Sequence, residues 1–171
     1  IPRPETELVA GLAIELAAAV EPTRLVADLG TGSGAIGLAL ASELPLDGTT
    51  VWITDASRDA LDVARANLSG IGRSARNVRV AHGEWFAALP ADARGAFDVI
   101  VANPPYVADA SPDLAASVLE WEPRSALFAG PDGLADITTL VAGAVAWLAP
   151  GGWLVLEIGH DQGPAVRSLF E

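Results

Sequence analysis

The chain of 171 residues is long enough for one domain with a sizeable core, and a hydrophobic fraction of 51% excludes intrinsic disorder. Its 22 acids outnumber its 10 bases, all of them arginine, and the net charge of −12 disfavours a surface that holds nucleic acid or an anionic membrane by bulk charge. Without cysteine there are no disulfides, thiolate metal sites or thiol nucleophiles. Two histidines are too few to build a metal site without help from carboxylates, and we expect no metal.

Helical and strand patterns alternate along the whole chain. Apolar residues at helical spacing predict helices, while β-branched and aromatic runs predict strands. Ser57 is expected to cap the helix after the second strand, because its hydroxyl can accept a bond from an amide of the first turn. The predicted elements, in chain order, are helix 6–20, strand 25–27, helix 35–43, strand 50–54, helix 58–68, strand 78–80, strand 97–102, a loop with a short helix over 109–124, helix 136–148, strand 153–158 and helix 164–170.

This alternation indicates an α/β fold. Short, continuous apolar strands between helices are typical of a doubly wound, mostly parallel sheet that is covered on both faces. Ligands bind such sheets beyond the carboxyl ends of the strands. Four polar residues follow apolar runs and are therefore candidate site residues: Asp28, Asp55, Glu84 and Asn103.

Residues 137–156 need a separate interpretation, because these 20 residues carry no charge and are long enough to span a membrane. The segment Pro150-Gly151-Gly152 lies inside this run and predicts a turn. We therefore expect a buried helix, a turn and a buried strand rather than a membrane span. No basic and apolar leader is visible, so no signal peptide is predicted and we expect a cytoplasmic protein.

A glycine-rich loop, residues 28–34, lies between the first strand and the second helix. Its alternating glycines let the backbone take positive φ and approach a ligand closely. The spacing Gly32-x-Gly34-x-x-Gly37, with Asp55 about 20 residues further on, fits a dinucleotide-binding fingerprint in which the acid binds ribose hydroxyls. NAD and S-adenosylmethionine both carry such a ribose, so the loop alone leaves both ligands open. A tight turn without a ligand is the structural alternative.

The segment Asn103-Pro104-Pro105-Tyr106, after the fourth strand, discriminates between NAD and S-adenosylmethionine as the ligand. Its prolines fix φ and remove two donors, which makes the loop stiff and leaves its carbonyls free. The Asn103 Oδ1 and the Pro104 carbonyl can accept both hydrogens of a substrate NH2 and hold its lone pair toward an electrophile, while Tyr106 packs on the planar group. A methyl sulfonium needs no further activation, so the motif favours methyl transfer. A proline-rich surface turn capped by asparagine is the alternative.

With these motifs in order, the whole chain resembles the class I S-adenosylmethionine-dependent methyltransferases, and among them the HemK/PrmC family of release-factor glutamine methyltransferases. The glycine loop is shared by many methyltransferases, and Asn-Pro-Pro-Tyr also occurs in adenine and guanine amino-methyltransferases. The leading Arg-Pro-Glu-Thr-Glu at residues 3–7 makes the resemblance specific, and segments 122–127 and 156–163 also fit.

The resemblance implies a Rossmann-like class I methyltransferase core that is C-terminally incomplete. Residues 1–171 would be its catalytic domain, with the family's N-terminal helical domain and last strands absent. The implied cofactor is S-adenosylmethionine, with S-adenosylhomocysteine as product, held by Asp28, Gly30, Thr31, Gly32, Ser33, Gly34, Asp55, Ala56, Glu84, Trp85 and Asn103. The implied substrate contacts are Asn103, Pro104, Pro105 and Tyr106, of which Asn103, Pro104 and Tyr106 are catalytic. Arg3 and Glu5 are expected near the cofactor or substrate.

The implied activity is methyl transfer to the side-chain amide nitrogen of a glutamine in a peptide chain release factor, by a monomer with no membrane or nucleic-acid partner. One alternative is an amino-methyltransferase acting on adenine or guanine in nucleic acid, which the net charge of −12 disfavours. Another is an NAD(P)-dependent oxidoreductase, which leaves Asn-Pro-Pro-Tyr unexplained. A third is a non-catalytic cofactor-binding remnant. His82 is expected to be structural, and His160 to lie on a solvated loop.

Overall fold

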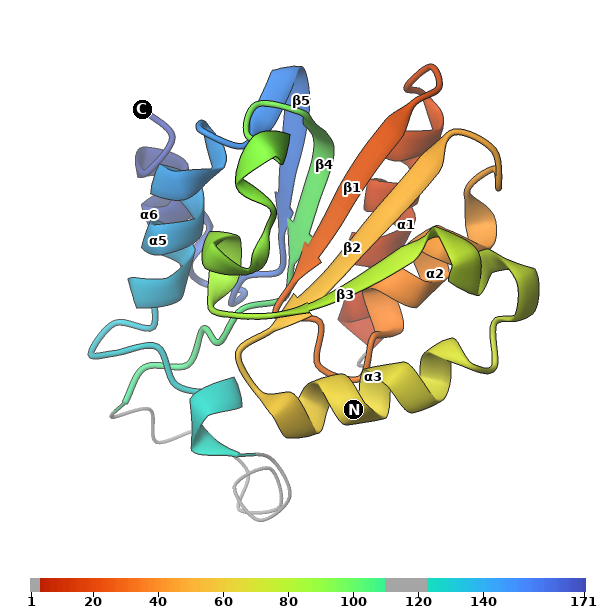
Figure 1. Ribbon diagram of the computed structural model, residues 1–171. Coiled ribbons are helices and arrows are strands. Elements are labelled where there is room, and N and C mark those ends of the chain that lie inside the picture. The colour runs from red at the N-terminus through yellow and green to blue at the C-terminus, as the bar shows by residue number, and fades with distance from the viewer. Residues whose placement is uncertain (1–3, 110–122) are drawn as a thin grey trace. The chain divides into compact units, whose positions relative to one another are not determined.

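The chain divides into two compact units in the computed structural model, which describes residues 4–109 and 123–171 (Figure 1). The first unit holds the whole sheet and consists of Ile1–Asn103 and Ala144–Glu157, while the second consists of Pro104–Gly143 and Ile158–Glu171. The loop and short helix predicted over residues 109–124 fall almost entirely outside the described residues, as does Arg3.

The elements of the first unit lie close to where the sequence patterns predict them. The Ser57 hydroxyl accepts a bond from the Ala60 amide at 3.2 Å, which confirms the predicted cap. The helices are α1 (Pro4–Ala18), α2 (Ala35–Glu43) and α3 (Arg58–Leu68), and the strands are β1 (Arg24–Leu29), β2 (Thr49–Asp55), β3 (Val78–His82), β4 (Phe97–Ala102) and β5 (Leu148–Leu156).

The five strands form one parallel sheet in the order β3-β2-β1-β4-β5. Because the strands are parallel, their carboxyl ends meet at one edge of the sheet. In the register, Leu29 of β1 pairs with both Thr54 of β2 and Ala102 of β4, so the residues that follow these three strands start side by side. The chain order reverses between β1 and β4, which is where ligands bind in sheets of this kind.

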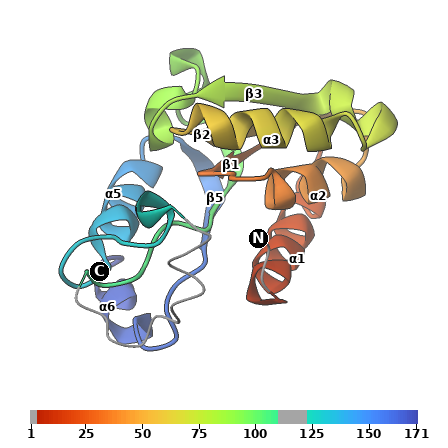
Figure 2. The same cartoon turned by 90° about the horizontal axis from the view of Figure 1, so that it is seen from below.

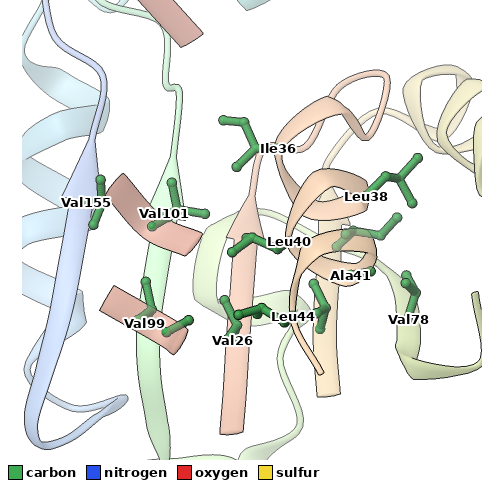
Figure 3. Close-up of a cluster of buried hydrophobic side chains, with 14 of the residues drawn as sticks. Val26, Ile36, Leu38, Leu40, Ala41, Leu44, Val78, Val99, Val101 and Val155 are labelled. Carbon is green, nitrogen blue, oxygen red and sulfur yellow. The ribbon is translucent and has the colours of Figure 1, made fainter. Parts of the chain in front are cut away.

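One face of this sheet packs against α1, α2 and α3, which lie on the same side of the strands (Figure 2). Leu40 of α2 and Leu44, the residue that follows this helix, lie beside Val26 of β1 in the centre of this core (Figure 3). Side chains on the other face of the central strands are also removed from solvent, with Ala27 and Ile100 fully buried. The prediction of an α/β fold with a parallel sheet buried on both faces is therefore confirmed.

The start of β5 differs from the sequence prediction. We expect a helix to residue 148 and a turn at Pro150-Gly151-Gly152, whereas the preceding helix ends at Ala144 and the strand includes this tripeptide. Leu148 already pairs with Phe97, and the register between β4 and β5 then shifts before Trp153 pairs with Val99. An irregularity in the hydrogen-bond ladder thus accommodates the proline and the positive φ of Gly151. The tripeptide that is expected to form a turn forms a bulge within the strand instead.

The second unit contains α6 (Gly163–Ser168) and α5 (Ala135–Ala144) except for its last residue. Val107 forms an isolated bridge with Phe128 in the same unit. The uncharged run 137–156 is divided between α5 and β5, as predicted. The prediction of a buried strand is wrong, because β5 lies at the edge of the sheet and Val155 is its only buried residue. Among residues 4–109 and 123–171, no helix combines the length and the apolar character needed to cross a membrane.

Candidate functional site

The glycine loop leaves β1 and enters α2 through three residues with positive φ, namely Gly30 at 70°, Gly32 at 55° and Gly34 at 88°. These values lie in the region that L side chains rarely adopt, so the loop needs glycine at each of the three. A Cβ added to Gly32 would meet no atom within 4 Å, which leaves open space beside this part of the backbone. The loop therefore presents main chain rather than side chains to a ligand.

Asp28 forms hydrogen bonds with the loop and with the first turn of α2. Its Oδ2 accepts bonds from the Thr31 hydroxyl at 2.5 Å and from the Gly37 amide at 2.8 Å. Its Oδ1 is buried and has no hydrogen-bond partner among the residues that the structure describes. Burial raises the pKa of this carboxyl to about 6. A buried carboxylate oxygen without a donor is costly, and a cationic ligand group would satisfy it.

Asp55, at the end of β2, ties the loop to the neighbouring strand. Its Oδ2 accepts the Gly32 amide at 2.9 Å and its Oδ1 accepts the Ser57 amide at 2.8 Å. A carboxylate has about four acceptor positions, so these two bonds leave capacity for ligand hydroxyls. His82 donates to the carbonyl of the exposed Ala56 at 3.0 Å, which supports the structural role predicted for this histidine.

Trp85 lies against the loop, whereas its neighbour Glu84 is exposed. A Cβ on Gly30 would come to 3.0 Å from the Trp85 ring, so the glycine makes room for the indole. Trp85 itself has φ 44°, a conformation that is uncommon for a bulky residue and marks strain at functional sites. Glu84 makes no capping bond to the 3₁₀ turn Trp85–Ala88 that follows it. The structure thus brings the predicted aromatic residue into contact with the loop.

Asn103 follows Ala102, the residue of β4 that pairs with Leu29 just before Gly30. Its Nδ2 donates to the Thr6 hydroxyl at 3.3 Å, and that hydroxyl donates to Glu157 Oε2 at 2.8 Å. Thr6 and Glu157 are only 7% and 6% exposed. Sequence reasoning placed Asn103 but missed these two partners. Glu157 directly follows β5, which ends at Leu156. The strand predicted over 153–158 contained this residue, so the rule that identified Asn103 did not single it out.

The rest of the Asn-Pro-Pro-Tyr motif belongs to the second unit. Pro104 is buried there, and Pro105 and Tyr106 are half-buried. The Tyr106 carbonyl accepts a bond from Gln162 Nε2 at 3.0 Å, and Gln162 Oε1 accepts the Gly159 amide at 2.8 Å. The backbone of the motif is thereby fixed by a side chain from the segment before α6.

Known proteins similar to this chain identify its family. Residues 10–123 match the family model of the methyltransferase small domain. The chain is 51% identical over 171 residues to a release factor glutamine methyltransferase of Xylella fastidiosa and 47% identical over 174 residues to one of Burkholderia pseudomallei. These alignments cover 99% and 100% of this chain but only 59% of each relative.

Solved structures agree on the fold. The crystal structure of an S-adenosylmethionine-dependent methyltransferase from Agrobacterium tumefaciens superposes with a TM-score of 0.68 at 18% identity, covering 99% of this chain and 50% of that one. At this level of identity the likeness concerns the arrangement of strands and helices alone. Because the family model covers most of the chain and the sheet has the same architecture, the chain belongs to the methyltransferase small domain family.

Proposed function

We propose that this chain transfers a methyl group from S-adenosylmethionine to the side-chain amide nitrogen of a glutamine in peptide chain release factors, acting as a monomer in the cytoplasm. The observation that carries the proposal is the position of Asn103, whose amide stands at the same sheet edge as the glycine loop. In this loop the buried Asp28 Oδ1 has no hydrogen-bond partner among the described residues. The relatives from Xylella fastidiosa and Burkholderia pseudomallei, which bear the name of this activity, support the choice of substrate.

The cofactor would be held by the loop and the acids around it. The unpartnered Asp28 Oδ1 suits its ammonium group, and the free acceptor positions of Asp55 suit its ribose hydroxyls. The Trp85 indole, packed against Gly30, offers a flat apolar surface for its adenine. When bound, this cofactor supplies an electrophilic methyl group on a positively charged sulfur.

The substrate amide requires positioning, because its nitrogen lone pair is delocalised and weakly nucleophilic. Asn103 Oδ1 and the Pro104 carbonyl would accept the two hydrogens of the glutamine NH2 and hold the nitrogen toward the methyl group. Tyr106 would pack against the planar amide. Positioning of this kind can account for a large part of a rate enhancement. The nitrogen would bond to the methyl carbon as the carbon–sulfur bond breaks, and it would lose one proton after the attack, so no strong general base is needed at Asn103.

The test is methyl transfer from labelled cofactor to a purified release factor, with wild type and Asn103→Ala compared. We expect wild type to modify the glutamine and Asn103→Ala to lose transfer while still binding S-adenosylhomocysteine, with most of the affinity kept. Full activity of Asn103→Ala would remove this residue from the mechanism. Transfer to tRNA or DNA instead of the release factor would favour the nucleic-acid alternative. Thermal stabilisation by NAD and not by S-adenosylhomocysteine would overturn the choice of cofactor.

A further inference from the structure

Three side chains from distant parts of the first unit form one chain of hydrogen bonds. Thr6 lies in the first turn of α1, Asn103 follows β4, and Glu157 follows β5. Asn103 Nδ2 donates to Thr6 Oγ1 at 3.3 Å, and Thr6 Oγ1 donates to Glu157 Oε2 at 2.8 Å. Thr6 and Glu157 are buried and Asn103 is half-buried, so water does not readily replace these bonds.

The carboxylate of Glu157 determines which atom donates and which accepts in each of these hydrogen bonds. An ionised carboxylate only accepts hydrogen bonds, so the single proton of the Thr6 hydroxyl goes to Glu157. Thr6 Oγ1 then has only lone pairs left to offer Asn103. An Asn103 amide rotated by half a turn would place its oxygen against those lone pairs, with no hydrogen between the two atoms. The nitrogen must therefore face Thr6, and Oδ1 faces the other way.

We propose that Thr6 and Glu157 are positioning residues that fix the orientation of the Asn103 amide, so that Oδ1 and not Nδ2 meets the substrate. This inference rests on the proposed function. An outward oxygen accepts a hydrogen from the NH2 of glutamine and repels the carboxylate of glutamate, which has no hydrogen to give. The same three residues would therefore both orient the nucleophile and select a primary amide over an acid.

Kinetics of Thr6 variants provide the first test. Thr6→Val keeps the shape of the side chain but removes the hydroxyl, and we expect kcat to fall about tenfold to a hundredfold. Thr6→Ser keeps the hydroxyl and should restore kcat to near the wild-type value. Thr49→Val is the matched control, because Thr49 is also buried in the first unit and its hydroxyl has no partner among the described residues. All three variants should bind S-adenosylhomocysteine as wild type does.

Wild-type kcat in Thr6→Val would overturn the inference, and so would a Thr6→Ser variant as slow as Thr6→Val. A drop in kcat for Thr49→Val equal to that of Thr6→Val would also overturn it, since any buried threonine would then have the same effect. A glutamate-containing peptide should not inhibit the wild-type enzyme competitively, whereas strong competition by that peptide would count against the selection of an amide.

Side-chain amide signals in ¹⁵N NMR spectra provide a test that does not need the substrate. The chain has only three asparagines and one glutamine, so the Asn103 signals can be assigned with Asn103→Asp. We expect Thr6→Val to shift the Asn103 NH2 signals and speed their exchange with water, while Thr6→Ser leaves them in place. In Glu157→Gln the new amide can donate to Thr6, which frees the hydroxyl to donate to Asn103 Oδ1, and two sets of Asn103 signals should appear.

The NMR measurement tests the orientation of the Asn103 amide independently of the proposed function. Asn103 signals that do not respond to Thr6→Val would overturn the inference, whatever the activity. Signals that respond as expected in a chain that methylates no glutamine substrate would uphold the fixed orientation and overturn the proposed function.

Discussion

Asp28 should make the folded state less stable as the pH rises, and Asp28→Asn should remove this dependence. Burial raises the pKa of the carboxyl from 3.8 to about 6, although the bonds from Thr31 and Gly37 lower it. The folded chain thus holds the proton more tightly than the unfolded chain. The stabilisation is full below about pH 4 and is lost as the pH rises through about 6. The shift corresponds to about 3 kcal/mol, of which about 2 kcal/mol is lost between about pH 4.5 and about pH 7.5.

Urea unfolding of wild type and Asp28→Asn at these two pH values isolates the effect. The asparagine oxygen can still accept from Thr31 and Gly37, and its NH2 then takes the place of the unpartnered Oδ1. That buried amide costs about 1–3 kcal/mol, but it costs the same at both pH values because it does not titrate. The difference in unfolding free energy between the two proteins should therefore change by about 2 kcal/mol from one pH to the other.

Asp62→Asn is the control, because it removes one carboxyl from an exposed position on α3 where the side chain is 74% exposed. The difference in unfolding free energy between Asp62→Asn and wild type should stay nearly constant between the two pH values. Burial of Asp28 is not the cause if Asp28→Asn keeps the full pH dependence of wild type. General repulsion in an acidic chain is the cause instead if Asp62→Asn loses as much of that dependence as Asp28→Asn.

Two further substitutions test the packing of α2 and the binding role of Asp55. Gly37→Ala should lower the unfolding free energy by about 1–3 kcal/mol in urea unfolding, because its Cβ would overlap Ile53 Cγ2. Gly11→Ala is the control and should be neutral or stabilising, because its Cβ meets nothing within 4 Å. Equal changes in unfolding free energy for the two variants would show that the overlap at Gly37 is not the cause. Asp55→Ala should weaken S-adenosylhomocysteine binding in calorimetry by about tenfold to a hundredfold, since it loses an acceptor for the ribose and frees the Gly32 amide. Unchanged affinity would remove Asp55 from the ribose site.

Most of the fold could be predicted because its signals are local. Apart from Asp98, the run 97–102 is apolar and rich in β-branched residues, and β4 has these bounds. Ser57 is followed by a helical pattern and caps α3. The prediction was wrong at the start of β5, where the local turn signal of Pro150-Gly151-Gly152 gave way to pairing of Leu148 with Phe97. Pairing between residues far apart in the chain cannot be read from spacing within a window of a few residues.

The candidate site was predictable to the extent that it obeys the rule of strand ends. Asp28 and Asp55 lie at the carboxyl ends of β1 and β2, and Asn103 directly follows β4. The rule identifies all three without knowledge of the strand order. The partner of Asn103 escaped prediction because Thr6 lies 97 residues away in what reads as an ordinary first turn of a helix. The left-handed conformation of Trp85 also has no local signal, since no glycine marks the position.

The negative charge of the chain has a consequence for cofactor binding at the edge of the sheet where the carboxyl ends of the strands meet. Asp28, Asp55 and Glu157 all stand at carboxyl ends of strands, and each accepts bonds from groups of the first unit. Charges in such a poorly solvated place act over longer distances than charges in water. Under the proposed function the methyl donor carries a positive sulfur, whereas its product does not. The acids therefore attract the donor more strongly than the product, so a negative charge that repels nucleic acid favours exchange of spent cofactor for fresh.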